Sequence, residues 1–467
     1  MTDFQPDFTP DNLAAAGRLG YAEDRGYEWP TDPRTLTALE HWRSLKFGVI
    51  MHWGLYATIG QDGSWSLCRE NIGAFMEPPA SWSGTEDEYE AFYKELRKNF
   101  TGEDYRPEEW AAMCAKAGMK YLVFTSKHHD GFAMYNTAES DYKVTAADVP
   151  LGRDILRETF DAFRAEGLET GVYFSKADWA HPGYWKAGGN TVNRLHNYNI
   201  DEDPQAWDGF VQFTQRQIEE LLTNYGDISV LWLDAGWVNE PDEPIGIDHI
   251  AQRARELQPD ILVVDREVHG PNENYRTPEQ EIPSETLDYP WESCITLTPG
   301  WCSMRPDDAT RPAHEVIATL ARIVSRGGNY LLGIGPDATG AISRNIVTTL
   351  EQVGGWMDVN GEAIYGTVPG GEDADLLDDG GSGYEWHFTR TDSTIFALAL
   401  IGDADGTAGF DLKVSTTTPV RSARVLGTDV VIPVENNDGE ITVAVPRTTA
   451  RLALVLALEL ATEPVTL

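Results

Sequence analysis

The feature that most constrains the fold is a regular alternation of strand-like and helix-like segments over roughly the first 360 residues. Short apolar runs, typical of buried parallel strands, alternate with segments whose apolar residues recur at helical spacing. The predicted strands cover residues 47–51, 121–125, 171–175, 228–233, 261–266 and 329–335, and the predicted helices cover residues 107–117, 154–166, 203–225, 248–257, 313–325 and 342–357. This alternation is typical of a (β/α)8-like barrel or of a doubly wound sheet.

Polar and aromatic residues at the ends of several predicted strands favour the barrel. His52 follows the first strand, His128 and His129 follow the second, and Asp234 ends the fourth. A barrel builds its active site from many strand ends, whereas a doubly wound sheet uses one switch point. Long inserts at residues 57–105 and 267–300 predict a TIM-type barrel that is somewhat irregular and leave the number of strands open.

The pattern changes after about residue 365. Short strand-like segments at residues 385–388, 394–400 and 441–445 are separated by turns rich in Gly and Asp, which is typical of an antiparallel β-sandwich. We therefore predict a catalytic barrel over residues 1–364 and a C-terminal β-sandwich over residues 365–467, with the boundary within residues 361–371.

The composition restricts the partners. A net charge of −39 argues against nucleic acid and anionic membranes and favours a neutral substrate. Four scattered cysteines without a C-x-x-C pair indicate neither a zinc site nor a disulfide framework. The first residues lack a basic segment followed by an apolar one, so we expect a cytoplasmic protein. The oligomeric state is left open.

Asp234 is the first candidate for chemistry, because a carboxylate at the end of a buried strand lies where such folds place their active sites. A lone Asp in this position also caps a following segment or pairs with an Arg. Cleavage of a glycosidic bond requires a second carboxylate. Glu279, in the long insert, and Glu292, at the entry to the next strand, both qualify, although each also fits a solvated or salt-bridged loop residue.

The histidines indicate hydroxyl recognition more than metal binding. Adjacent residues on a strand point to opposite faces, so His128, His129 and Asp130 are poorly placed to share one ion. His52 and one of the pair also fit a structural role in which the ring satisfies backbone groups. Arg266 either orients a carboxylate or forms a structural ion pair. The Gly-rich segments lack a phosphate-loop Lys, so we expect no metal, nucleotide or other cofactor.

Four motifs, in this order, resemble the α-L-fucosidases of glycoside hydrolase family 29. The resemblance covers the first 360 residues and rests on the segments 46–54 (KFGVIMHWG), 127–132 (KHHDGF), 231–236 (LWLDAG) and 325–336 (SRGGNYLLGIGP). It implies a retaining exo-glycosidase, on an irregular (β/α)8-like barrel followed by a β-sandwich, that acts on terminal α-L-fucosides of oligosaccharides or glycoconjugates.

The resemblance also implies roles for individual residues. It makes Asp234 the nucleophile, and it lines the fucose pocket with His52, His128, His129, Tyr173, Trp232 and Arg266. The family's Glu-Trp pair in the first long loop falls at Glu70-Asn71, which places Glu70 in the pocket and Asn71 where the aromatic is expected.

The general acid/base is predicted from the same resemblance. The Thr-Pro-Glu motif that ends at Glu279 supplies this group in many members, and some members place it in the segment that corresponds to Trp291-Glu292. Glu279 is therefore the first choice and Glu292 the second. A retaining mechanism requires the two carboxyl groups to lie about 5–5.5 Å apart.

Two alternatives stay open at this point. One is a catalytically weak, lectin-like protein that binds fucose on the same scaffold. The other is a related glycosidase that acts on α-L-galactosides, which differ from fucosides at C5. Hydrolysis of a chromogenic α-L-fucoside would distinguish an active fucosidase from the lectin-like protein. Comparing the rates on paired α-L-fucoside and α-L-galactoside substrates would distinguish a fucosidase from a galactosidase.

Overall fold

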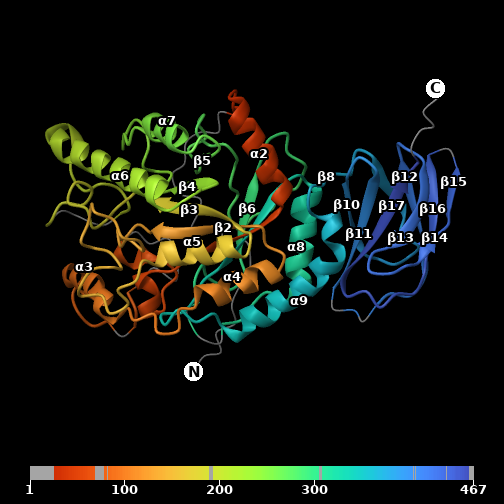
Figure 1. Cartoon of the computed structure of the whole chain (residues 1–467), viewed down its shortest axis with the longest axis horizontal. Helices are drawn as coiled ribbons and strands as arrows, with labels where there is room; N and C mark the ends of the chain where they lie inside the picture. Colours follow the sequence, from red (N-terminus) through yellow and green to blue (C-terminus); the bar gives the residue numbers. More distant parts are fainter. Residues whose placement is uncertain are drawn as a thin grey trace.

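The computed structural model describes residues 26–68, 78–80, 82–188, 193–303, 305, 308–402, 404, 406–437 and 439–461, with the side chains of residues 86 and 87 excepted. Figure 1 shows two parts side by side: a barrel of strands surrounded by helices, and a smaller part made of β-sheets that carries the C-terminus.

The first part is built on a parallel sheet of seven strands in the order β5-β4-β3-β2-β1-β7-β6. These strands are β1 (Phe47–Met51), β2 (Tyr121–Lys127), β3 (Glu169–Ser175), β4 (Val230–Asp234), β5 (Leu262–Asp265), β6 (Glu292–Thr296) and β7 (Asn329–Ile334). Nearly every strand residue is buried, because helices cover the outside while side chains fill the inside. The predicted fold class is confirmed, with seven ladder strands among the described residues.

The helices that surround the sheet follow the strands in the chain (Figure 1). They are α2 (Pro33–Leu45), α3 (Glu86–Glu95), α4 (Pro107–Lys116), α5 (Ile155–Ala165), α6 (Pro204–Asn224), α7 (Ile247–Leu257), α8 (Ala313–Ser325) and α9 (Arg344–Asn360). Pro stands in the first turn of α4 and α6, where its missing N–H costs no hydrogen bond. Among the described residues, we find no helix with the length and apolar character needed to cross a bilayer.

Helix α2 closes the end of the barrel at which the strands begin. The indole of its Trp42 stacks on Tyr275 with ring centroids 3.9 Å apart. The Trp42 carbonyl accepts a hydrogen bond of 2.8 Å from Asn329, the first residue of β7. Trp42 and Leu39 belong to the same buried cluster as the side chains inside the barrel. The opposite end, where the strands finish, is therefore the end that is left for a site.

The ladder has a seam between β5 and β6, which do not pair with each other. Residues 272–280 fill this seam. They form an isolated antiparallel bridge from Glu273 to Val264 of β5, and isolated parallel bridges to Trp291 and to Cys294 of β6. The last of these bridges is made by Glu279, so the segment that closes the barrel also carries a predicted site residue.

The second part is a β-sandwich. One sheet has the order β14-β13-β17-β11-β10-β8 and the other has the order β15-β16-β12-β9. The strands are β8 (Val368–Pro369), β9 (Ala374–Asp378), β10 (Glu385–Arg390), β11 (Thr394–Gly402), β12 (Phe410–Thr416), β13 (Val420–Val425), β14 (Val431–Ile432), β15 (Val434–Asn437), β16 (Glu440–Val445) and β17 (Leu452–Leu460).

The six-stranded sheet has two buried faces. Alternate residues of β11, such as Ile395 and Ala397, pack in a core of the sandwich itself, whereas Phe396 and Leu398 join the core of the barrel helices. The Trp356 indole of α9 donates a hydrogen bond of 2.9 Å to the Ala453 carbonyl of β17. The predicted domain boundary at residues 364 and 365 falls between α9 and β8 and stays a prediction.

Candidate active site

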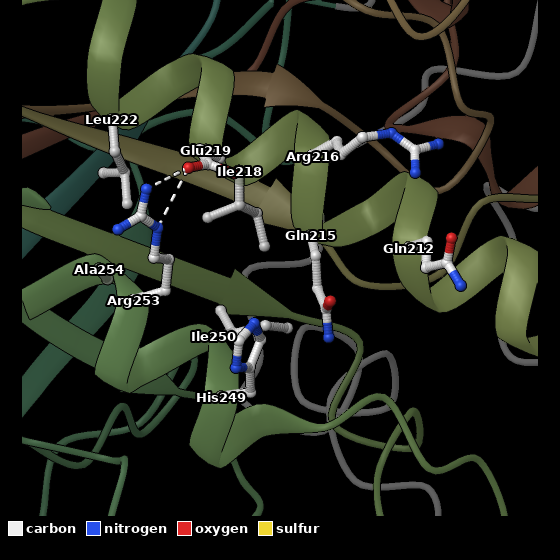
Figure 2. Close-up of a pocket in the computed structure, with 10 residues that line it drawn as sticks. All are labelled: Gln212, Gln215, Arg216, Ile218, Glu219, Leu222, His249, Ile250, Arg253 and Ala254. Carbon is white, nitrogen blue, oxygen red and sulfur yellow. Dashed lines mark hydrogen bonds and ion pairs between the residues drawn. The ribbon is translucent and has the colours of Figure 1, made fainter. Parts of the chain in front are cut away.

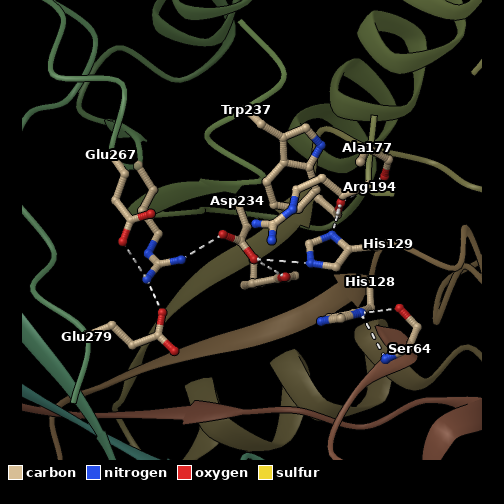
Figure 3. A network of polar contacts seen from close by, with 12 residues as sticks. Ser64, His128, His129, Ala177, Arg194, Asp234, Trp237, Glu267 and Glu279 are labelled. Carbon is tan, nitrogen blue, oxygen red and sulfur yellow. Dashed lines mark hydrogen bonds and ion pairs between the residues drawn. The ribbon is translucent and has the colours of Figure 1, made fainter. Parts of the chain in front are cut away.

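Most of the predicted site residues meet where the barrel strands finish (Figure 3). They come from several different strands and are brought together because neighbouring parallel strands end at the same rim. His52 follows β1, His128 and His129 follow β2, and Tyr173 lies in β3. Asp234 is the last residue of β4, Arg266 follows β5, and Glu279 lies in the segment that fills the seam.

Asp234 is held by two groups, Tyr173 and Arg266, and lies near a third, His129. The Tyr173 hydroxyl donates a hydrogen bond of 2.5 Å to its Oδ2, the Arg266 Nη1 lies 2.8 Å from its Oδ1, and the His129 Nε2 lies 3.8 Å from its Oδ2. Burial raises the pKa of this carboxyl, but Arg266, His129 and the Tyr173 hydroxyl together lower the pKa well below its ordinary value. The carboxylate is thus ionised across the neutral range, as a nucleophile requires.

The residue after Asp234 has an unusual backbone. Ala235 has φ +67°, in the left-handed region that only Gly enters without steric cost. It is completely buried. Such conformations occur where surrounding structure fixes them, often beside reacting groups.

Arg266 joins the two predicted catalytic carboxylates. Its Nη1 binds Asp234, its Nη2 forms an ion pair with Glu279, and Nη2 also lies 3.0 Å from Glu267 Oε1. The guanidinium lies over the Trp232 ring, 5.0 Å from its centroid. The side chain is only 7% exposed, and those of Asp234 and Glu279 are 14% and 12% exposed. One buried cation therefore pairs with both carboxylates, Asp234 and Glu279.

The three histidines form one wall of the site and are electrically neutral. Burial lowers the pKa of His52 and of His129 to about 3, and lowers the pKa of His128 well below its ordinary value, although Asp234 opposes the shift in each case. The rings of His128 and His129 lie 4.1 Å apart, and the ring of His52 lies 4.9 Å from Tyr173. Neutral imidazoles suit hydrogen bonds with sugar hydroxyls.

Glu292, the second choice for the acid/base, is not brought into this group. It is the first residue of β6, so it lies toward the end of the barrel where the strands begin. It is completely buried and accepts a hydrogen bond of 2.5 Å from the Tyr121 hydroxyl. Burial raises the pKa of Glu292 to about 7. A carboxyl enclosed inside the barrel has no access to a glycosidic oxygen at the rim.

The other predicted loop residue, Glu70, lies outside the described residues, as does Asn71. Within the described part of the first long loop, Ser64 and Trp65 are the residues that reach the histidine pair. The Trp65 ring lies 4.9 Å from His129. The first long loop thus supplies an aromatic side chain to the site through Trp65, whereas the sequence motif led us to expect the aromatic at the position of Asn71.

Further aromatic and charged residues at the site were missed from the sequence. The Trp237 ring lies 5.1 Å from His129, and the Trp301 ring lies 5.3 Å from His52. The guanidinium of Arg194 lies 5.1 Å from the rings of both Trp65 and Trp237. The sequence signal for Trp237 was its position three residues after Asp234. Arg194 and Trp301 come from long loops without any motif.

A second pocket, of about 190 Å³, lies elsewhere, between the outer sides of α6 and α7 (Figure 2). Its carboxylate, Glu219, forms an ion pair with Arg253. His249 and Ile250 also line it. This surface lacks the paired carboxylates of the rim, so it offers no comparable chemistry. Within the described ranges, we find no group of three or more metal-ligating side chains.

Comparison with known proteins agrees with this geometry. Residues 16–362 match the family model described as Alpha-L-fucosidase. A putative alpha-L-fucosidase of Caenorhabditis elegans is 28% identical over 424 residues, covering 83% of this chain and 82% of the relative.

Solved structures agree as well. Alpha-L-fucosidase isoenzyme 1 from Paenibacillus thiaminolyticus superposes with a TM-score of 0.74 at 29% identity, covering 92% of this chain and 100% of that chain. A family 29 alpha-L-fucosidase from Bacteroides thetaiotaomicron, trapped as a covalent intermediate with 2-fluoro-fucosyl fluoride, has a TM-score of 0.70 at 24% identity, with 95% of this chain and 99% of that chain covered.

Proposed function

The chain belongs to the α-L-fucosidase family of glycoside hydrolases, family 29, and on that premise we propose that Asp234 and Glu279 carry out a retaining hydrolysis of terminal α-L-fucosides. The observation that supports this assignment best is the shared contact with Arg266, which holds the two carboxylates at one point of the rim. A protein that only binds fucose needs no such pair, and no contact among the site residues that the structure describes favours that alternative.

In the first step, Asp234 attacks the anomeric carbon of the fucosyl group and the bond to the leaving oxygen breaks. Glu279 transfers its proton to that oxygen, so the leaving group departs as a neutral alcohol. The low pKa of Asp234 keeps this nucleophile ionised. The product of the step is a fucosyl ester on Asp234 and a deprotonated Glu279.

In the second step, Glu279 removes a proton from water, and the resulting oxygen attacks the anomeric carbon of the ester. The carboxylate of Asp234 is released, Glu279 is protonated again, and fucose leaves. Two displacements at the same carbon retain its configuration. Arg266, which contacts both carboxylates, balances the negative charge that moves between them.

The rest of the pocket is suited to a small neutral sugar. His52, His128 and His129 offer ring nitrogens to hydroxyl groups, and Trp65, Trp237 and Trp301 offer apolar faces. We infer that the fucosyl unit occupies this enclosure and that the remainder of an oligosaccharide or glycoconjugate extends past Glu279, as in any exo-glycosidase whose acid faces the leaving group.

Replacement of each carboxylate tests the assignment. Asp234→Ala should lower turnover of para-nitrophenyl α-L-fucoside by about 10⁴-fold or more with the fold intact. Azide should then restore part of the activity and yield the fucosyl azide of inverted configuration, because one displacement remains. Glu279→Ala should yield the azide of retained configuration, because the ester still forms.

Glu219→Gln, in the outer pocket between α6 and α7, is the matched control and should leave the rate unchanged. Normal hydrolysis by Asp234→Ala would refute its role. Retained azide from Asp234→Ala, or inverted azide from Glu279→Ala, would show that the two roles have been assigned to the wrong residues.

A further inference from the structure

We propose that Ser64 and Ser175 hold His128 and His129 in opposite tautomers, so that the adjacent rings present one N–H donor and one nitrogen acceptor to the hydroxyls of the sugar. This inference rests on the proposed function for the identity of the ligand. The tautomers themselves follow from the hydrogen bonds of the two serines alone. Ser64 and Ser175 are in this sense positioning residues, because they act on the sugar only through the histidines.

The tautomer of His129 follows from the single proton of the Ser175 hydroxyl. The Ser175 Oγ lies 2.8 Å from the Ala177 carbonyl oxygen, which can only accept, so the hydroxyl proton is donated there. The same Oγ lies 2.7 Å from the His129 Nδ1. Having donated its proton, Oγ can only accept from Nδ1. The proton of His129 is therefore on Nδ1, and Nε2 carries a lone pair.

The contact of His129 with Asp234 is consistent with this result. The His129 Nε2 lies 3.8 Å from the Asp234 Oδ2, beyond the distance of a hydrogen bond. A protonated Nε2 would be drawn toward this carboxylate, whereas a lone pair is not. The gap leaves Nε2 available to accept a proton from a sugar hydroxyl.

The tautomer of His128 follows from a backbone donor. The Ser64 N–H points at the His128 Nδ1 at 3.4 Å, and the Ser64 Oγ lies 2.5 Å from the same nitrogen. An N–H group can only donate, so Nδ1 accepts and carries the lone pair. The proton of the neutral ring is then on Nε2. Figure 3 shows both contacts of Ser64 on one side of the His128 ring, with the other ring nitrogen directed away from Ser64.

Both rings must be neutral to have a defined tautomer, since a protonated imidazole has none. Burial lowers the pKa of both rings. The charges that act on His129 are Asp234, which raises its pKa, and Arg194, His52 and Arg266, which lower it. On His128 they are His129, which lowers the pKa, and Asp234, which raises it.

Opposite tautomers make the wall formed by the two histidines selective for hydroxyl groups. A hydroxyl both donates and accepts, so it satisfies the His128 Nε2–H as an acceptor and the His129 Nε2 as a donor. The centroids of the two rings are 4.1 Å apart, so the rings can bind the same hydroxyl or two neighbouring ones. A fluorine or methoxy group in place of a hydroxyl has no proton to donate and leaves the His129 Nε2 unsatisfied.

Nitrogen-15 NMR of histidine-labelled enzyme tests the tautomers without any substrate. Signals are assigned by their loss in His128→Gln and His129→Gln. We expect His128 to show a protonated Nε2 and an unprotonated Nδ1, and His129 to show the reverse. The same tautomer for both rings, or the reverse pattern, would overturn the proposal even if the enzyme proves to be an active fucosidase.

Two serine variants test whether Ser64 and Ser175 determine the tautomers of the histidines. Ser175→Ala removes the acceptor for the His129 Nδ1–H and should move that proton toward Nε2. It should also raise KM for the fucoside by about two- to tenfold, the equivalent of one hydrogen bond. Ser64→Ala removes only the hydroxyl and keeps the backbone N–H that faces the His128 Nδ1, so the proton of His128 should stay on Nε2. Ser66→Ala is the matched control, because this buried serine bonds to Tyr89 instead. Unchanged His129 signals in Ser175→Ala, or an Nδ1–H form of His128 in Ser64→Ala, would refute the positioning role.

If the tautomers are as expected and the enzyme shows no activity on any α-L-fucoside, the proposed function fails while the hydrogen-bond assignment stands. If fucoside turnover is normal and the tautomers are wrong, the reverse holds. The two claims are thus distinguishable by one set of samples.

Discussion

Removal of Arg266 is the most informative perturbation of this site. In the wild type, this one guanidinium contacts Asp234, Glu267 and Glu279, and its side chain is 7% exposed. Arg266→Met retains an unbranched chain over the Trp232 ring but removes the charge. Three carboxylates are then left together, and Asp234 keeps the burial that raises its pKa without the cation that lowers it.

The size of the effect follows from the geometry. The Arg266 Nη1 and the Asp234 Oδ1 are 2.8 Å apart, which places the charge centres about 4 Å apart, where an ion pair is worth about 4 kcal/mol at an effective dielectric constant of about 20. This energy corresponds to roughly a thousandfold gain in the proton affinity of Asp234. The nucleophile acts ionised, so activity is lost as the pH falls through its pKa. The acid limb of kcat/KM therefore moves to higher pH in the variant.

Initial rates with para-nitrophenyl α-L-fucoside across the acid side of neutrality measure this limb. Arg266→Lys should give an intermediate profile, since one ammonium group retains charge but cannot contact all the carboxylates as the fork does. Arg253→Met removes an exposed Arg from its ion pair with Glu219 and should leave the profile unchanged. An Arg266→Met enzyme that folds and keeps the wild-type acid limb would refute the electrostatic role of Arg266.

Three further outcomes are expected. Ala235→Gly should raise the free energy of unfolding by about 1 kcal/mol, because φ +67° costs Ala but not Gly; urea titration measures the change, and a loss of stability would contradict the strain. Glu292 has a pKa raised from 4.5 to about 7, so the folded state binds its proton more tightly than the unfolded state and stability falls as the pH rises through that window. Glu292→Gln should remove about 3 kcal/mol of this pH dependence while keeping fucosidase turnover, and abolished turnover would return Glu292 to consideration as the acid. Added NaCl should raise the thermal midpoint, because it screens the repulsion of a net charge of −39, and a midpoint that falls with salt would exclude that explanation.

The secondary structure that was predicted correctly is the part with strong local periodicity. The strand predicted at residues 47–51 is β1, and the helix predicted at residues 203–225 is α6 (Pro204–Asn224). Helix α2 was missed because it buries only Thr35, Leu39 and Trp42 and so lacks an apolar stripe. The bridges made by residues 272–280 were not predicted, because this segment bonds to two different strands, a tertiary arrangement with no period of its own.

The residues of the site also divide into those that the sequence predicts and those that it does not. Residues at strand ends could be predicted, since a parallel sheet fixes their common rim. Arg194 could not, because it lies in a loop without a motif and side-chain hydrogen bonds fix its position: its carbonyl accepts hydrogen bonds from the Trp179 indole at 3.2 Å and from the Tyr184 hydroxyl at 3.0 Å. The ranking of Glu279 over Glu292 came from the family motif, and the structure separates the two residues because Glu292 begins β6, at the end of the barrel away from the rim.

The seam between β5 and β6 gives the two proposed catalytic residues different backbone support. Asp234 ends a strand that is paired on both sides, so its backbone is as rigid as the barrel. Glu279 lies on a segment joined through isolated bridges, which open without disrupting the ladder. If Glu279 is the proton donor, as proposed, we expect insertions near the seam to reposition it for leaving groups of different shape while the proposed enclosure for the fucosyl unit stays the same. An irregular closure of the barrel thus becomes the place where this scaffold can acquire a new linkage preference.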